Sequence, residues 1–319
     1  MQQSTLMCAL MRALRALASL KLTLVALALL ALSILYVYLA EESGSLALVL
    51  SLLLVALNLV AALATHPVFR RPSALLVFHL GLIALLLLVA LGRLTYLKGH
   101  VELAEGEEFG GALSGVQAGP WHWNRLDRVR FTNLGFRIDY APGLQRNATR
   151  NTVSYADADS GERRAQIGDQ TPLVLSGYRF YTSPNKGFAP AFLWFPANGQ
   201  PLLGTVHLPS YPVNEYHQAR DWELPGTGIR LWTMLQFDER ILDPEKPSEF
   251  RMPKQHKVIV RVGGQRHELQ PGQSIDLPQG HLVYDGLRSW MGYTVFYDWT
   301  IHWMLAVCMI SVGALGWHY

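Results

Sequence analysis

The stretch SALLVFHLGLIALLLLVALGRL, residues 73–94, decides the fold class of this chain. It is a continuous apolar run with two strongly ionisable side chains, His79 near its start and Arg93 near its end. A helix of about 20 apolar residues is long enough to cross the hydrocarbon core of a bilayer. Ser73, which follows a proline, is a candidate N-cap. The stretch therefore predicts a transmembrane helix.

Working outward, three further runs of the same kind predict a membrane protein with four transmembrane helices, at about residues 22–40, 45–65, 73–94 and 298–319. The apolar part of the last is Thr300 to Trp317. Only 16% of all residues are charged, against about 25% in an ordinary soluble domain. A cleaved signal peptide is the alternative for the first run, but that run is too long for a typical signal sequence.

The residues between the third and fourth spans have a different composition, with many charged side chains. Residues 96–296 contain 21 Lys and Arg and 21 Asp and Glu, which is typical of a soluble domain. Short runs of strand character lie between turns at residues 136–140, 173–181 and 258–262. The last run precedes Gly263-Gly264 and predicts a hairpin, whereas residues 230–242 fit either a helix or a strand. We expect a cytoplasmic segment (1–21), three spans (22–95), a mainly-β extracytoplasmic domain (96–297) and a fourth span (298–319).

The positions of the basic residues predict how the chain is oriented in the membrane. Arg12, Arg15 and Lys21 precede the first span, and Arg70-Arg71 lie between the second and third, whereas the turn after the first span contains Glu41-Glu42. Because Lys and Arg accumulate on the cytoplasmic side, both termini are expected to be cytoplasmic and the large domain extracytoplasmic.

Several functional classes have no support in the sequence. The two cysteines, Cys8 and Cys308, lie outside the large domain, so this domain is expected to contain no disulfide. No Cys-x-x-Cys-His occurs, which excludes covalent c-type haem attachment to this chain. No phosphate-binding loop or hydrolase signature is found, and no nucleic-acid partner is expected.

His79 is the most informative side chain, because an ionisable group inside a span is costly unless it has a partner. One interpretation is an interhelical hydrogen bond, for example to Asn58 in the second span. The other is axial ligation of haem iron, since neutral imidazole is a common haem ligand and needs no charge in the bilayer. The residue alone leaves both open.

Several segments together resemble the ResB/CcsB family of system II cytochrome c biogenesis proteins. These are FHLG at 78–81 with the rest of that span, GHVELAEGE at 99–107, SGYRFY at 176–181 and LRSWMGYTVFYD at 287–298. The layout of three spans, a β-rich outer domain and one final span also agrees. The Pro-Gly that often follows the last segment in the family is replaced by Trp299-Thr300, and the outer domain is shorter than in many members.

The resemblance implies a haem-handling subunit of a cytochrome c maturation complex in the bacterial inner membrane. Its expected partners are a CcsA/ResC-type membrane protein, apocytochrome c, thiol-reducing proteins and the lipid bilayer. Haem b would be a non-covalent cargo, with His79 as axial ligand to its iron and a histidine of the partner as the second ligand. The chain is expected to lack synthase activity alone, or to form a holocytochrome c synthase with that partner.

Secondary candidates and alternative functions remain. His318 is a candidate second ligand and Arg93 a candidate contact for a haem propionate. His302 and His122, each beside tryptophans, could touch haem or a partner, but aromatic interface anchoring for His302 and ordinary surface or core placement for His122 are the favoured explanations. One alternative function is a non-haem structural or assembly subunit whose outer β domain docks a partner protein. The other is an outer-face module that binds a small ligand or apocytochrome.

Overall fold

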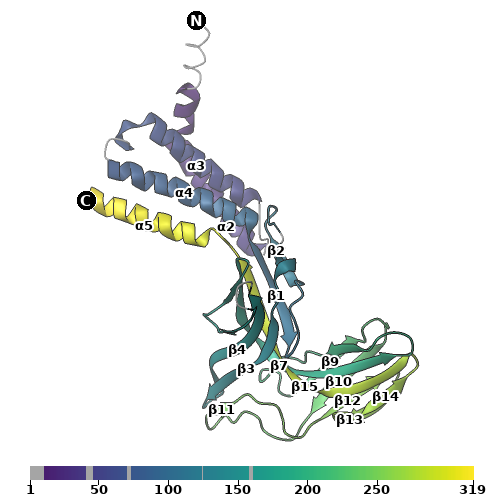
Figure 1. Ribbon diagram of the computed structural model, residues 1–319. Helices are drawn as coiled ribbons and strands as arrows, with labels where there is room; N and C mark the ends of the chain where they lie inside the picture. Colours follow the sequence, from purple (N-terminus) through teal and green to yellow (C-terminus); the bar gives the residue numbers. More distant parts are fainter. Residues whose placement is uncertain (1–10, 41–45, 70–72, 124, 158–160) are drawn as a thin grey trace. The chain divides into compact units, whose positions relative to one another are not determined.

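The computed structural model describes residues 11–40, 46–69, 73–123, 125–157 and 161–319, and these divide into two compact units (Figure 1). The helical unit comprises the described part of Met1–Lys98 together with Gly115–Asn124 and Phe296–Tyr319. The β unit comprises Gly99–Ser114 and the described part of Arg125–Val295. A short segment from the middle of the chain, Gly115–Asn124, thus belongs with the helices.

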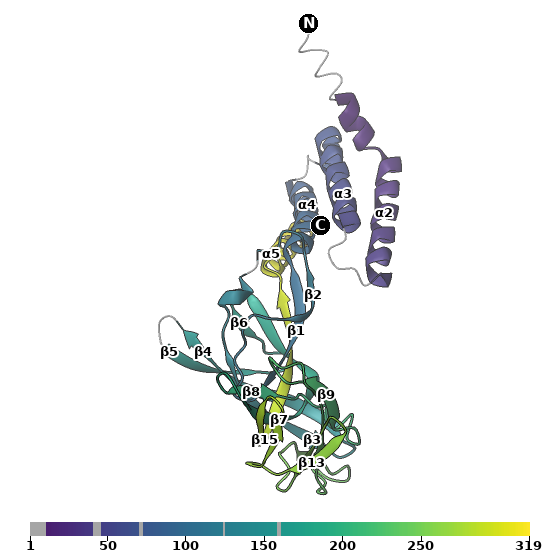
Figure 2. The same ribbon diagram turned by 90° about the vertical axis from the view of Figure 1, so that its right-hand side faces the viewer.

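Among the described residues, four helices are long and apolar enough to cross a membrane, and they confirm the four predicted spans (Figure 2). Each begins and ends within a few residues of its predicted bounds. The helices are α2 (Leu20–Leu39), α3 (Leu46–Thr65), α4 (Ser73–Thr95) and α5 (Ile301–His318). A short 3-10 turn, η1 (Pro67–Phe69), follows α3. Each helix packs against the next along the chain: α2 on α3, α3 on α4 and α4 on α5.

Polar side chains join α2 and α3. Thr23 Oγ1 donates a 2.9 Å hydrogen bond to Asn58 Oδ1, and Asn58 Nδ2 donates one of 2.6 Å to the carbonyl of Leu17. Further along the pair, the hydroxyls of Ser33 and Ser51 lie 2.8 Å apart. Because water is absent from a bilayer core, such groups need partners on a neighbouring helix. These contacts give Thr23, Ser33, Ser51 and Asn58 polar partners within the protein.

Small residues bring α4 and α5 close together. A Cβ atom at Gly81 would collide with the hydroxyl of Ser311, and one at Gly92 would lie 2.8 Å from Thr300 Oγ1. The order of these two contacts shows that the helices are antiparallel. Glycine and serine allow this close backbone approach, as is typical of packed membrane helices.

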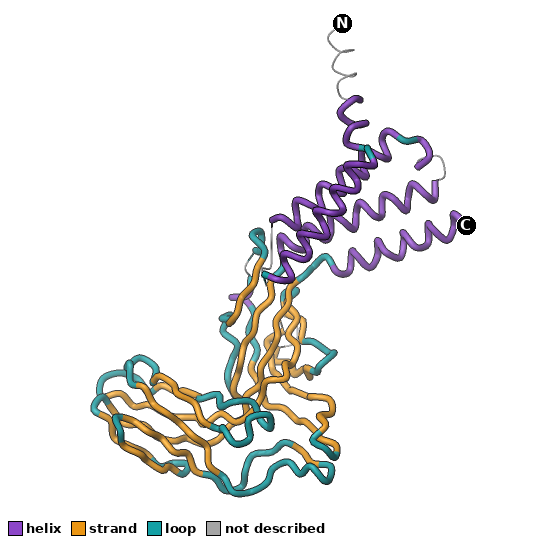
Figure 3. The backbone as a smooth tube through the Cα atoms, turned by 180° about the vertical axis from the view of Figure 1, so that it is seen from behind, coloured by secondary structure: helices purple, strands orange, loops and turns teal. Residues whose placement is uncertain are grey.

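In the part of the chain that the structure describes, the strands, orange in Figure 3, form three sheets. The largest has the order β2-β1-β15-β7-β6, with β14 paired to β15 and β8 to β7. The other two have the orders β13-β12-β10-β9 and β11-β3-β4-β5 and are antiparallel. The strand bounds are β1 Leu97–Ala104, β2 Ser114–Ala118, β3 Thr132–Ala141, β4 Gln145–Asp157, β5 Gly161–Ile167, β6 Leu173–Leu175, β7 Tyr178–Pro196, β8 Leu202–Thr205, β9 Ala219–Glu223, β10 Arg230–Gln236, β11 Ser248–Glu249, β12 Lys257–Val262, β13 Gln265–Leu269, β14 Ser274–Leu277 and β15 Gly280–Tyr297.

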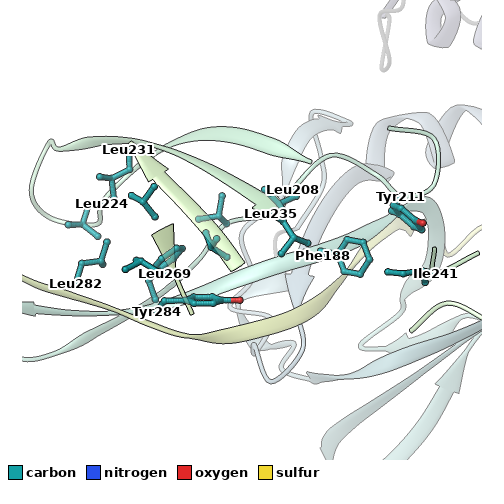
Figure 4. Packing of buried hydrophobic residues seen from close by; sticks show 14 of the residues in the cluster. Phe188, Leu208, Tyr211, Leu224, Leu231, Leu235, Ile241, Leu269, Leu282 and Tyr284 are labelled. Carbon is teal, nitrogen blue, oxygen red and sulfur yellow. The ribbon is translucent and has the colours of Figure 1, made fainter. Parts of the chain in front are cut away.

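The main core of the β unit lies between strands of different sheets. Alternate residues of β10, Leu231, Thr233 and Leu235, are buried, as expected for a strand with one face on a core. Leu231 and Leu235 belong to a cluster that also contains Phe188 of β7 and Tyr284 of β15 (Figure 4). The mainly-β character predicted for this region is confirmed.

The predicted hairpin is present. Val262 of β12 pairs with Gln265 of β13 across Gly263 and Gly264, whose φ values are 55° and 84°. Two successive positive φ values explain the glycine pair, because other residues rarely adopt this conformation. The ambiguous residues 230–242 are resolved as strand β10 followed by loop.

Candidate functional site

His79 lies in the second turn of α4, and its half-buried ring has an aromatic neighbour on each of two sides. The ring centroid is 5.0 Å from that of Phe69 in η1 and 5.5 Å from that of Phe78. Leu75 and Leu76, one turn earlier, continue the apolar surroundings. The imidazole is therefore held among apolar groups near one end of the helix.

A backbone hydrogen bond determines the tautomer of His79. Nδ1 lies 2.7 Å from the carbonyl oxygen of Leu75. A carbonyl can only accept, so Nδ1 must carry the proton. In the neutral ring, Nε2 then keeps its lone pair. A metal-bound histidine commonly donates its other ring N–H to a carbonyl in this way, which orients the ring and raises its basicity.

The alternative role of His79, a hydrogen bond to Asn58, is wrong for this structure. Asn58 uses its amide on Thr23 and Leu17, which join α2 to α3. Among the residues that the structure describes, the ring of His79 has Leu75 of its own helix as its hydrogen-bond partner. The side chain therefore does not tie α4 to another helix.

Among the described residues, the hydrogen bonds and ring contacts of His79 include neither His318 nor Arg93. Arg93 is 14 residues further along α4, about 21 Å at 1.5 Å per residue, and its guanidinium lies over the ring of Tyr96 at 5.8 Å. His318 is exposed at the end of α5, where its ring contacts Tyr319. A single ligand held by His79 would not reach Arg93.

The two histidines beside tryptophans lie near the other end of α4. The Nδ1 of His122 donates a 2.8 Å hydrogen bond to the carbonyl of Thr95, and its ring packs edge-on against Tyr297. His302 is exposed in the first turn of α5. These positions are remote from His79, because Thr95 is the last residue of α4 and His79 lies near its start.

Sequence reasoning missed a charged cluster in the β unit. His207 Nδ1 lies 3.3 Å from Glu102 Oε2, and its Nε2 lies 3.7 Å from Glu107 Oε2. The ring is stacked on Trp290 with a centroid distance of 5.4 Å, and Arg220 lies 3.9 Å from Glu102. Glu102 and Glu107 both belong to the GHVELAEGE segment. Nothing in the local sequence marks His207 as their partner.

The electrostatics of this cluster favour a charged imidazole. Burial opposes the charge of His207, but the two carboxylates outweigh it and raise its pKa above the ordinary value. The hydrogen bond with His207 lowers the pKa of Glu102. Burial works against the charge of Glu107, but His207 and the Ala104 N–H together lower its pKa.

We expect the stability of the β unit to depend on pH through this cluster. A raised histidine pKa stabilises the fold below about pH 6.5, the ordinary value, and this contribution is lost as the pH rises through the folded-state value. The lowered pKa values of Glu102 and Glu107 stabilise the folded state above about pH 4.3, the ordinary value, and this contribution is lost as the pH falls through the folded-state values. Urea unfolding of the full chain in detergent, followed by the strand signal in circular dichroism, should therefore show highest stability between these limits.

The variant His207→Gln should flatten this profile on its alkaline side. The matched control is His281→Gln, because His281 pairs with Asp276 at 2.6 Å but is 45% exposed, and exposed ion pairs contribute little. An unchanged pH profile in His207→Gln would contradict the prediction.

Comparison with protein-family models gives a match to part of the chain. Residues 64–201 match the model of the ResB-like family, and no curated protein matches the chain. The matched residues include α4 with His79, the GHVELAEGE segment and strand β7. The recognised resemblance to ResB/CcsB proteins is thereby confirmed, and over residues 64–201 this membrane chain is ResB-like.

Proposed function

We propose that this chain is the haem-handling subunit of a system II cytochrome c maturation complex, with His79 as an axial ligand to haem b. The match of residues 64–201 to the ResB-like family supports a cytochrome c biogenesis membrane subunit. The observation that carries the more specific role is the hydrogen bond from His79 Nδ1 to Leu75, since it leaves Nε2 as the nitrogen with a lone pair.

The residues around His79 suit haem. A neutral imidazole in an apolar span carries no charge into the bilayer, and Phe69 and Phe78 present aromatic surface beside it. No group of three or more His, Cys, Asp or Glu side chains suited to a metal ion occurs among the described residues. A haem iron, already held by four ring nitrogens, needs only one such ligand on each side.

The work of this chain would be to hold and orient the cargo. Haem supplies the redox-active iron and the vinyl groups that are attached to apocytochrome. The Leu75 carbonyl keeps the proton on Nδ1 of His79, and the apolar helices exclude water from the ligating nitrogen. With one ligand from this chain, the second comes from a CcsA/ResC-type partner. The basic residues before α2 and after α3 support an orientation with both termini in the cytoplasm and the β unit outside the inner membrane.

The test is an absorption spectrum of the chain purified with and without the CcsA/ResC-type partner. We expect the co-purified complex to show a bis-imidazole haem spectrum, because two neutral histidines complete the coordination. The chain alone should retain less haem, because one ligand is missing. A complex with both subunits at equal amounts and no haem absorption would overturn the proposal and favour the structural or assembly role.

A further inference from the structure

The loop Gly119–Trp123 is bound to the end of the third span, although it follows α4 by more than twenty residues. The last carbonyls of a helix have no partners within the helix. Here the N–H of Trp121 donates to the carbonyl of Leu94 at 2.8 Å, and His122 Nδ1 donates to that of Thr95 at 2.8 Å. The N–H of Gly119 donates to the carbonyl of Tyr96 at 2.9 Å. The loop thus caps α4.

The close approach depends on glycine. A Cβ at Gly119 would collide with the backbone of Leu94, so no other residue fits where the loop crosses the helix end. The structure accordingly groups Gly115–Asn124 with the helical unit and not with the β unit. The position of the loop is therefore set by the end of a membrane span.

This loop carries two exposed tryptophans. The side chains of Trp121 and Trp123 are 61% and 43% exposed, and Trp123 also packs edge-on against Tyr297. More aromatic side chains lie beside them in the same unit. Trp299 Nε1 donates a 3.0 Å hydrogen bond to Thr95 Oγ1, and Trp303, in the first turn of α5, is 62% exposed. Exposed indoles thus gather around the ends of α4 and α5.

The depth of this cluster follows from the length of α4. Its 23 residues span about 34 Å at 1.5 Å per residue, slightly more than the roughly 30 Å of a bilayer core. Its end at Thr95 therefore lies at the membrane surface. Cations accompany the aromatic rings there: Arg93 lies over Tyr96 at 5.8 Å and Lys98 over Phe296 at 5.9 Å. Tryptophan, tyrosine and basic residues are typical of this interfacial zone.

We propose that the loop Gly119–Trp123 is a membrane-interface anchor, in which Trp121 and Trp123 lie among the phospholipid headgroups. The loop is hydrogen-bonded to the end of α4, and it contains no acidic side chain that phosphate would repel. The indole ring has an apolar body and one N–H donor, which matches the boundary between acyl chains and headgroups. The loop adds a contact with lipid to those of the four spans.

Quenching of tryptophan fluorescence tests this proposal. The full chain is reconstituted in vesicles of phosphatidylcholine and phosphatidylglycerol, with or without phosphatidylcholine brominated near the headgroup. The double variant Trp121→Phe/Trp123→Phe removes two of the five tryptophans of the helical unit, which are Trp121, Trp123, Trp299, Trp303 and Trp317. We expect the double variant to lose the emission of these two indoles. This lost emission should be part of the emission that brominated lipid quenches in the unmodified chain. Phenylalanine keeps an aromatic ring, and circular dichroism verifies the fold.

The matched control adds a tryptophan in water. Tyr216 is 93% exposed in the β unit, so the added emission of Tyr216→Trp should be quenched by aqueous iodide and not by brominated lipid. If the emission lost in the double variant behaves like that of Tyr216→Trp, the loop faces water and the proposal is overturned. The proposal is also overturned if neither iodide nor brominated lipid quenches the emission lost in the double variant, because the two indoles would then be covered by protein.

Discussion

Replacing His79 with alanine is expected to abolish the haem absorption of the complex with the CcsA/ResC-type partner, and added imidazole is expected to restore it. The alanine removes the Nε2 lone pair that the Leu75 hydrogen bond leaves available. It also leaves a ring-sized space beside Phe69 and Phe78, which free imidazole can fill. Because added imidazole can replace a missing ligand but cannot refold the protein, restored haem absorption would show that His79→Ala lost only the ligand.

Two exposed histidines of the helical unit provide the controls for this variant. His318→Ala and His302→Ala remove imidazoles of α5 that, among the described residues, make no hydrogen bond or ring contact with His79, and the haem spectrum should survive both. The spectra are compared at equal amounts of complex. Full haem absorption in His79→Ala, without imidazole, would show that another group ligates the iron.

The second large effect is expected from Asn151→Ala in strand β4. Asn151 is fully buried, and its Nδ2 donates 2.8 Å hydrogen bonds to Asn133 Oδ1 and to the carbonyl of Gly135. Its Oδ1 accepts a 2.8 Å bond from the hydroxyl of Tyr293 in β15. Asn133 in turn donates to the carbonyl of Leu103 in β1. This network joins two different sheets of the β unit.

Alanine at position 151 leaves buried polar groups without partners. Each unsatisfied buried group costs about 1–3 kcal/mol, so the free energy of unfolding should fall by about 3–5 kcal/mol in sum. Urea unfolding of the full chain in detergent measures this change. Asn147→Ala is the matched control, because Asn147 lies on the same strand but is exposed, and its effect should be within about 0.5 kcal/mol. Equal losses in both variants would contradict the role of the network.

Features that depend on neighbouring residues could be predicted from the sequence. The spans follow from composition, because a bilayer core requires about 20 consecutive apolar residues with all backbone groups bonded within the helix. The hairpin at Gly263-Gly264 follows from the need for two positive φ values. By contrast, β7 and β15 are single strands of 19 and 18 residues, whereas the sequence shows only short strand-like runs within them. Their length depends on pairing with other strands of the sheet.

The features of the candidate site also divide into those that the sequence predicts and those that depend on the tertiary structure. The sequence by itself determined that α4 is a membrane span and that His79, an ionisable group within it, needs an explanation. Only the tertiary structure decided that Asn58 forms a hydrogen bond with Thr23 of α2. It also showed that Glu102 meets His207, 105 residues away, and that the loop of Trp121 and Trp123 caps α4. The physical reason is that hydropathy acts residue by residue along the chain, whereas hydrogen bonds and ion pairs depend on which distant segments the fold brings within about 3 Å.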